Sequence, residues 1–323
     1  MHKFKKGDLI HMIKRIKEKN AITLLALIIT IIILLILATV SISLIINSGI
    51  LDNAQHGVDR YSEEEELEQI KLAVASARLK GNGFLTTENL NSELQEKFGE
   101  DKEASETSVG WFYTHNKNYR IYKDGHIENA DILPEEYQQV EYIENNVAQL
   151  QYIDTEVIPN ENTSVILDMM TFSSVNQAFF GCIEIDQRKT WRFFDNAGIY
   201  FDLNGRLHGN PLPKNVKINI ELHNYYVVKD GIKILESNPK TNLQLTSSLY
   251  IFTANGPNGV SKNTAKTRIY SCKIYNRDLI VRNFIPCYKE LSDNNIIIGL
   301  YDTVEGKFYV NHGEGTFIKG ADV

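Results

Sequence analysis

Residues 268–288 read RIYSCKIYNRDLIVRNFIPCY, and this stretch decides the fold class. Two runs rich in β-branched and aromatic residues, Arg268–Tyr275 and Arg282–Tyr288, flank a polar segment, which is the pattern of two strands and a connection. In the first run Tyr270, Cys272 and Ile274 alternate loosely with their neighbours, as in an antiparallel strand with one inward face. The stretch therefore predicts sheet rather than helix.

The same pattern extends from Asp131 to the end of the chain, without a long helical period. Further strands are predicted at residues 140–144, 150–156, 164–172, 178–185, 190–195, 199–203, 216–222, 225–229, 233–236, 248–252, 296–301 and 307–311. So many short strands in one domain predict a two-sheet antiparallel sandwich of jelly-roll type. We expect a mainly β protein with this sandwich at residues 131–323.

Six short motifs follow one another along this region. They read YQQVEYIE at 137–144, QYIDT at 151–155, RIYSCKIY at 268–275, VRNFIPC at 281–287, GLYD at 299–302 and GKFY at 306–309. In this order they resemble the concanavalin A-like, laminin-G-like lectin domains of bacterial surface and phage tail proteins, over residues 133 to 320. The resemblance implies the fold more sharply than the ligand, because relatives bind sugars, bind proteins or only space other modules.

Sugar sites on such a sandwich need aromatic faces for stacking and polar side chains for the hydroxyls. Suitable residue types stand at Trp191, Arg192, Tyr200, Asp202 and Tyr225, which are our candidate ligand-binding residues. The alternative is that the aromatic residues fill the core, since alternation leaves only about half of such a set on an open face.

Calcium is common among the lectin relatives and needs several converging oxygens. Asp154, Asp168 and Asp302 are the candidate ligands, but the sequence does not bring them together. The eight His residues are scattered, and none pairs at metal-ligand spacing. We expect no metal and no other cofactor.

Glycosidases of related fold carry Glu-x-Asp-x-x-Glu on a strand, and residues 184–189 read EIDQRK. Lys189 occupies the position of the second catalytic Glu and cannot act as a carboxylic general acid. Phosphate-binding loops and the common zinc-protease and serine-hydrolase motifs are absent from the sequence. We therefore expect a protein that is not an enzyme, with glycoside hydrolysis as the least favoured alternative.

Three cysteines, an odd number, cannot all pair within one chain. Cys272 and Cys287 lie on predicted strands that are candidates for neighbours, which leaves a disulfide open and Cys182 unpaired. Buried free thiols are slightly favoured, because core Cys residues behave as small hydrophobes.

Residues 47–130 predict a small α+β stalk. Turn-forming residues between 47 and 61 predict a break in the preceding helix, and Ser62 with Glu65 fits the capping box of a second helix that stops at Gly81. Thr87 is the predicted cap of a third helix that ends at Gly99. Strand-like runs follow at 109–114, 119–122 and 126–128.

Residues 21–46 read AITLLALIITIIILLILATVSISLII, 26 residues without a charge. This length predicts a transmembrane helix, because about 20 apolar residues span the hydrocarbon core of a bilayer. Residues 1–20 form a basic leader, which the positive-inside rule places in the cytoplasm, so that everything after residue 47 is outside. The remainder of the chain is acidic, which excludes binding to nucleic acid by a basic surface.

The segment around KNAITLL at residues 19–25 resembles the start of a type IV pilin or pseudopilin. The resemblance implies cleavage between Ala21 and Ile22 by prepilin peptidase, and other pilin subunits as partners. Two departures put assembly in doubt: Ala21 replaces the usual Gly before the cut, and Ala26 replaces the usual Glu at the fifth mature position.

Together these features predict a single-pass bacterial membrane protein that displays a lectin-like sandwich outside the cell for adhesion to a glycan or a surface protein. The alternative is a minor pilin or pseudopilin of a type IV pilus or type II secretion-like system, with the sandwich as its tip module.

Overall fold

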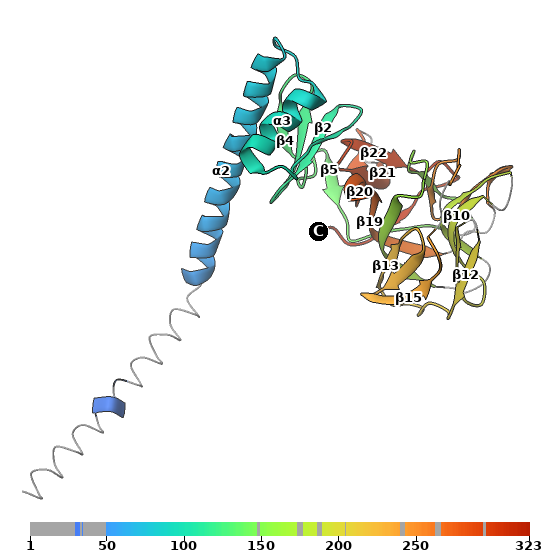
Figure 1. Ribbon diagram of the computed structural model, residues 1–323. Coiled ribbons are helices and arrows are strands. Elements are labelled where there is room, and N and C mark those ends of the chain that lie inside the picture. Colours follow the sequence, from blue (N-terminus) through green and yellow to red (C-terminus); the bar gives the residue numbers. More distant parts are fainter. Residues whose placement is uncertain are drawn as a thin grey trace, which may run out of the picture. The chain divides into compact units, whose positions relative to one another are not determined.

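The computed structural model describes residues 30–32, 34, 50–146, 149–172, 177–185, 189–203, 205–239, 243–261, 266–292 and 295–323 (Figure 1). The chain divides into two compact units, Met1–Glu68 and Gln69–Val323. The predicted leader and the cleavage position Ala21/Ile22 lie outside the described residues. Of the predicted span only Thr30–Ile32 and Leu34 are described, and these are helical. Within the described part of the chain, no helix has the length and apolar character needed to cross a membrane.

Helix α2 (Ile50–Lys80) is continuous for 31 residues. The predicted break between residues 47 and 61 and the predicted helix start at Ser62 are therefore wrong from Ile50 onward. Gly57 and the polar residues near it each cost at most about 1 kcal/mol inside a helix, which a long helix offsets. The predicted stop is confirmed: Gly81 follows the last helical residue, and the N–H of Gly83 donates to the carbonyl of Arg78 at 2.8 Å.

A small α+β region follows. It contains helix α3 (Thr87–Phe98) and strands β1 (Ser105–Glu106), β2 (Gly110–Thr114), β3 (Asn118–Tyr122) and β4 (Ile127–Asn129), which pair in the order β1-β2-β3-β4. The cap of α3 is Thr86 rather than the predicted Thr87, since the Thr86 hydroxyl accepts the N–H of Asn89 at 3.2 Å. Ile70 of α2 and Leu90 of α3 are fully buried.

Two sheets form the rest of the molecule. The first contains β7 (Ile153–Asp154), β9 (Gln177–Ile183), β10 (Thr190–Asp195), β11 (Ile199–Leu203), β12 (Arg206–Gly209), β16 (Tyr250–Ile251), β17 (Asn255–Gly256) and β18 (Gly259–Val260), with the order β12-β11-β10-β9-β16-β7 and β17 pairing with β9 and β18. The second contains β5 (Tyr137–Gln139), β6 (Ile143–Glu144), β8 (Thr163–Thr171), β13 (Ile218–Leu222), β14 (Tyr226–Lys229), β15 (Ile232–Glu236), β19 (Thr267–Asn276), β20 (Leu279–Glu290), β21 (Ile296–Asp302), β22 (Lys307–Val310) and β23 (Ile318–Lys319), with the main order β15-β14-β13-β8-β19-β20-β21-β22.

One hydrophobic core lies between these sheets. The first sheet contributes Trp191 and Phe201, and the second contributes Leu167, Ile220 and Ile274, all in one cluster and each at most 1% exposed. Strand β8 alternates buried and half-buried residues along its whole length, as a strand with one inward face should. The predicted mainly β fold and the two-sheet sandwich are thus confirmed for the described residues.

The loose alternation seen in residues 268–275 has a structural cause. The β19–β8 register shifts between Ile269 and Ser271, so the inward positions are Ile269, Cys272 and Ile274. A bulge adds one residue to one strand, so the residues that face the core are odd-numbered on one side of it and even-numbered on the other. Neither of the two alternating series therefore lies wholly on one face: Ile269 faces inward from one series, and Cys272 and Ile274 from the other.

The three cysteines are free thiols and all are buried. Strand β19 pairs Cys272 with Phe284 of β20, not with Cys287. The preference for buried thiols over a disulfide is confirmed. Burial raises the pKa of both Cys182 and Cys287 to about 12.

Candidate functional site

Three charged residues form a row on the outer face of the first sheet. Arg192 on β10 pairs in register with Asp202 on β11, and Asp202 pairs with Arg206 on β12. Arg192 Nη2 lies 2.8 Å from Asp202 Oδ2, and Arg206 Nε lies 2.9 Å from Asp202 Oδ1. We call these residues the charged row. It places two guanidinium groups against one carboxylate, a net charge of +1 within a chain of net charge -7.

Asp202 orients both arginines. Its side chain is only 7% exposed, and Arg206 Nη2 also lies 3.3 Å from Oδ2. The hydrogen bond to Asp202 raises the pKa of Arg206 above its ordinary value, so this side chain stays charged. Within the described ranges, the buried Nε of Arg192 has no hydrogen-bond partner. A buried donor left unpaired is a cost that a purely structural ladder would avoid.

A row of stacked rings runs beside the charged row: its residues are two positions after Arg192 on β10, two before Asp202 on β11 and two after Arg206 on β12. The ring of Tyr200 lies between those of Phe194 and His208, with centroids 4.9 Å and 4.5 Å away and interplanar angles of 13° and 26°. We call these the ring row. The Arg192 guanidinium lies 4.1 Å from the centre of the Phe194 ring, and that of Arg206 lies 5.2 Å from the centre of Tyr200. Cation–π contacts therefore join the two rows.

Alternation along β10 and β11 explains why these side chains share one face. Trp191 and Phe193 belong to the core cluster, so Arg192 and Phe194 between and after them point outward. Beneath the charged row Gly181 of β9 pairs with Arg192, at a φ of 136°. A Cβ there would lie 2.2 Å from the carbonyl oxygen of Trp191, so only glycine permits this close pairing of β9 and β10.

The charged row opens onto a cavity of about 430 Å³. Besides the three charged residues, its lining is Ile183, Thr190, Gly256, Pro257, Asn258, Gly259, Val260 and Ser261. The last six come from the β17–β18 hairpin and the residue after it. The volume falls in the range of small-ligand pockets. Among the described residues that line it, Arg192, Asp202 and Arg206 are the only charged ones.

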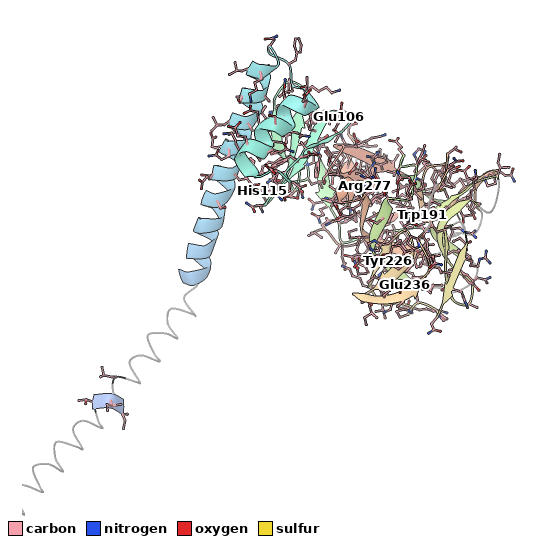
Figure 2. The ribbon with its side chains drawn as sticks, in the orientation of Figure 1. Glu106, His115, Trp191, Tyr226, Glu236 and Arg277 are labelled. Atoms are coloured by element: carbon pink, nitrogen blue, oxygen red, sulfur yellow. The ribbon has the colours of Figure 1, made fainter. Side chains whose placement is uncertain are left out.

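The structure unites three of the five residues predicted to bind ligand: Arg192, Tyr200 and Asp202. Trp191 is fully buried, in edge contact with Phe180 and Phe201 at centroid distances of 5.8 Å and 5.1 Å. A buried ring offers no face to a ligand, so the predicted role of Trp191 is replaced by a role in the core. Figure 2 labels Trp191 within the sandwich.

Tyr225 lies apart from the other candidates. It directly precedes β14 of the second sheet and contacts Tyr226 edge to face, with centroids 4.8 Å apart. The ring of Tyr226 also stacks on His223 at 4.2 Å. Since the charged row belongs to the first sheet, Tyr225 is not part of that site.

Sequence reasoning missed Arg206, Phe194, His208 and the β17–β18 hairpin. One signal was present: Asn204-Gly205 directly follows a predicted strand, and this dipeptide is the strongest short-range hairpin signal. A two-residue turn there would have placed Arg206 opposite Leu203, one residue from its observed partner Asp202. No signal in the sequence points to residues 256–261, because their place beside Arg192 depends on the pairing of β17 with β9.

Glu184 has a structural partner. Its carboxylate accepts the backbone N–H groups of Thr246 and Ser247 at 2.6 Å and 2.9 Å, and the Thr246 hydroxyl at 3.0 Å. Burial acts to raise the pKa of Glu184, but these hydrogen bonds outweigh it and hold the pKa below its ordinary value. Asp186 lies outside the described residues.

The three candidate calcium ligands have separate partners. Asp154 accepts the N–H of Glu156, Asp168 accepts the side-chain amide of Asn219, and Asp302 accepts the N–H of Asn283, each at 2.8 Å. In the described ranges no group of three or more His, Cys, Asp or Glu residues is arranged to hold a metal ion.

Comparison with known proteins gives little beyond the fold itself. No family model matches the chain, and no curated protein matches it. Among solved structures, domains LG4-5 of the mouse laminin α1 chain align with a TM-score of 0.30 and 9% identity, covering 60% of this chain and 82% of that chain. The sandwich is assigned from the two sheets and the shared core of this chain.

Proposed function

We propose that this protein is a membrane-anchored surface adhesin whose β-sandwich binds a glycan at the outer face of β10, β11 and β12. One observation carries the proposal: the charged row lines a cavity of about 430 Å³, together with polar residues of β10 and of the β17–β18 hairpin. Sugars present many hydroxyl groups, and the lining of this cavity brings together two guanidinium groups, a carboxylate and the side chains of Thr190, Asn258 and Ser261, all of which can hydrogen-bond to hydroxyls.

The arrangement is held rigidly enough for recognition. Asp202 is bound by both arginines, and each guanidinium also packs on the Phe194 ring, with centres 4.1 Å and 5.5 Å away. Side chains locked in this way lose little conformational entropy on binding. Strand pairing on both sides of β11 supports the whole set.

Membrane anchoring belongs to the same proposal. The 26 uncharged residues 21–46 support a single span, and the basic residues before it support a cytoplasmic N-terminus with the sandwich outside. In this orientation the partner is a glycan, or a protein that carries one, on another surface. The span is tested by protease protection in sealed vesicles: an exposed N-terminal tag together with a protected sandwich supports it in inside-out vesicles, and the reverse contradicts it.

A minor pilin or pseudopilin remains the second candidate, and helix α2 favours it. The helix runs without a break through 31 residues, and its C-terminal part, with Ile70, Val74 and Ala77 buried, packs within the unit that contains the small antiparallel sheet. This order of helix and small sheet is that expected of a pilin. Leader cleavage between Ala21 and Ile22, read by mass spectrometry, and recovery in sheared fibres support assembly; an intact N-terminus opposes it.

The proposal excludes catalysis. Glu184 is tied to the backbone of residues 246–247, and Lys189 stands where a glycosidase needs its second carboxyl group. Hydrolysis of a polysaccharide that is lost in the Glu184→Gln variant would overturn this part of the proposal.

The binding test is a glycan-array screen of the full chain in detergent, with and without calcium. Arg192→Gln is the site variant, and Arg277→Gln, at an exposed position in the β19–β20 turn, is the matched control (Figure 2). Saturable binding that Arg192→Gln loses and Arg277→Gln keeps supports the site. Binding that both variants keep moves the ligand elsewhere, and no binding to any glycan contradicts the proposed function.

A further inference from the structure

The net positive charge of the residues that line the cavity indicates what kind of ligand the site binds. This inference rests on the proposed function. Two guanidinium groups face one carboxylate, and the remaining lining residues, described above, are uncharged. An excess positive charge in a partly enclosed site is expensive unless the ligand supplies the opposite charge. The chain as a whole is acidic, so this local excess is not a general property of its surface.

Asp202 already shows what this site recognises. Its two carboxylate oxygens accept hydrogen bonds from both arginines, including two from Arg206, at 2.9 Å and 3.3 Å. The planar fork of a guanidinium group matches a planar carboxylate better than an ammonium group does. Asp202 thus fixes the two guanidinium groups in place and leaves them with a net charge of +1.

We propose that the site selects an acidic saccharide, in which the carboxylate of a uronic acid unit binds to Arg192 and Arg206 while the pyranose ring lies in the cavity beside the β17–β18 hairpin. The charged row explains the preference for an acid. The lining residues Thr190, Asn258 and Ser261 bring hydroxyl and amide groups that can bond to the hydroxyls of a sugar, which favours a sugar over an acidic peptide.

Arg206 is the residue that tests the charge preference. Its side chain is 59% exposed, whereas that of Arg192 is 20% exposed and packed on Phe194. Replacement of Arg206 therefore changes the charge of the site with little effect on the core. Because Arg206 is solvent-exposed, its attraction for an anion is screened by salt, and the affinity for an acidic ligand should fall as ionic strength rises.

The experiment compares two matched oligosaccharides on the full chain by isothermal titration calorimetry: oligogalacturonate and the galacto-oligosaccharide of equal length and linkage, which lacks the carboxylates. We expect the acidic sugar to bind about tenfold more tightly than the neutral one, and Arg206→Gln to lower the affinity for the acidic sugar by about tenfold. Arg277→Gln is the control and should change neither affinity. Circular dichroism checks that each variant is folded.

The outcomes separate this inference from the proposed function. Equal binding of both sugars overturns the acidic preference while the glycan-binding function stands. Absence of binding to either sugar by a folded chain overturns the acidic preference, and the glycan array then decides the function separately. Equal or tighter binding of poly-glutamate than of oligogalacturonate overturns the choice of a sugar.

Discussion

Arg120 on β3 donates a hydrogen bond from Nη2 to the backbone carbonyl of Thr303, which lies 183 residues later, directly after β21. The same side chain donates to the carbonyl of Val304 at 3.4 Å and to the carboxylate of Glu128 at 3.0 Å, and it is only 4% exposed. Phe112 of β2 and Val304 belong to one buried cluster. The small sheet and the end of β21 are therefore joined around one buried charge.

Removal of this guanidinium should weaken the joint. We expect Arg120→Gln to destabilise the protein by about 3 kcal/mol, because three acceptors lose a buried charged donor. The two tryptophans make the loss measurable: Trp111 lies on β2 and Trp191 on β10. In a Trp111→Phe background, fluorescence reports only Trp191, whereas far-UV circular dichroism is dominated by α2 and α3.

Urea unfolding followed by both signals should give one coincident transition in this background and two separate transitions when Arg120→Gln is added. Arg277→Gln serves as the exposed control. An unchanged midpoint with coincident transitions would show that the joint does not depend on Arg120.

Trp191 should behave as a core residue. Trp191→Ala is expected to destabilise the sandwich by about 3–5 kcal/mol, the cost of a large cavity in a close-packed interior. Trp191→Phe should cost less, because it keeps an aromatic ring against Phe180 and Phe201. Urea denaturation followed by circular dichroism measures both. A midpoint of Trp191→Ala close to that of the unaltered chain would contradict the buried position.

Asp302 should make stability depend on pH. It is fully buried, and burial raises its pKa from 3.8 to about 6, although the N–H groups of Asn283, Val304 and Glu305 and the charge of Arg282 act in the opposite direction. A carboxyl group whose pKa is raised by folding contributes stability below pH 3.8, and this contribution is lost as the pH rises through about 6. The full effect is about 3 kcal/mol.

The measurement is the difference in unfolding free energy between the unaltered chain and Asp302→Asn from pH 4 to pH 7. We expect the unaltered chain to lose stability relative to the variant as the pH rises over this range. Arg282 Nε lies 3.5 Å from the Asp302 carboxylate, and its charge acts to lower the pKa of Asp302. A difference that is constant with pH would contradict the raised pKa.

The thiols should be unreactive in the folded protein. Cys182, Cys272 and Cys287 are each fully buried, and burial raises the pKa of Cys182 and of Cys287 to about 12, so the reactive thiolate is scarce at neutral pH. With a chromogenic disulfide reagent at pH 8, we expect no rapid labelling until denaturant is added, when all three should react. Rapid labelling of one thiol in the folded state would place that residue at the surface.

The sequence alone determined where most of the longer strands form but not which of their faces is buried. The bounds of Thr190–Asp195 and Ile199–Leu203 follow from runs of aromatic and β-branched residues, and both are confirmed. The sequence does not show whether Trp191 or Arg192 faces the core, because alternate side chains point to opposite faces of a strand whichever face is buried. The second sheet supplies the reason: it covers only one face, and Trp191 lies on that side.

Turn-forming residues also gave a wrong prediction inside the long helix α2. The turn-forming residues between 47 and 61 predict a break, yet α2 is helical from Ile50 to Lys80, since helix propensity is a weak force per residue. By contrast, the stop at Gly81 was predictable, because glycine residues at 81 and 83 allow the chain to leave the helix.

The sequence by itself determined the fold class, most of the longer strands of the sandwich, the absence of a cysteine framework and three members of the candidate site, because periodicity and residue type are local properties. Only the tertiary structure decided that Arg206 joins Arg192 on Asp202, that the β17–β18 hairpin forms a wall of the cavity, and that Arg120 reaches Thr303. These depend on strand order and register between segments far apart in the chain, which the residues of a single strand do not encode.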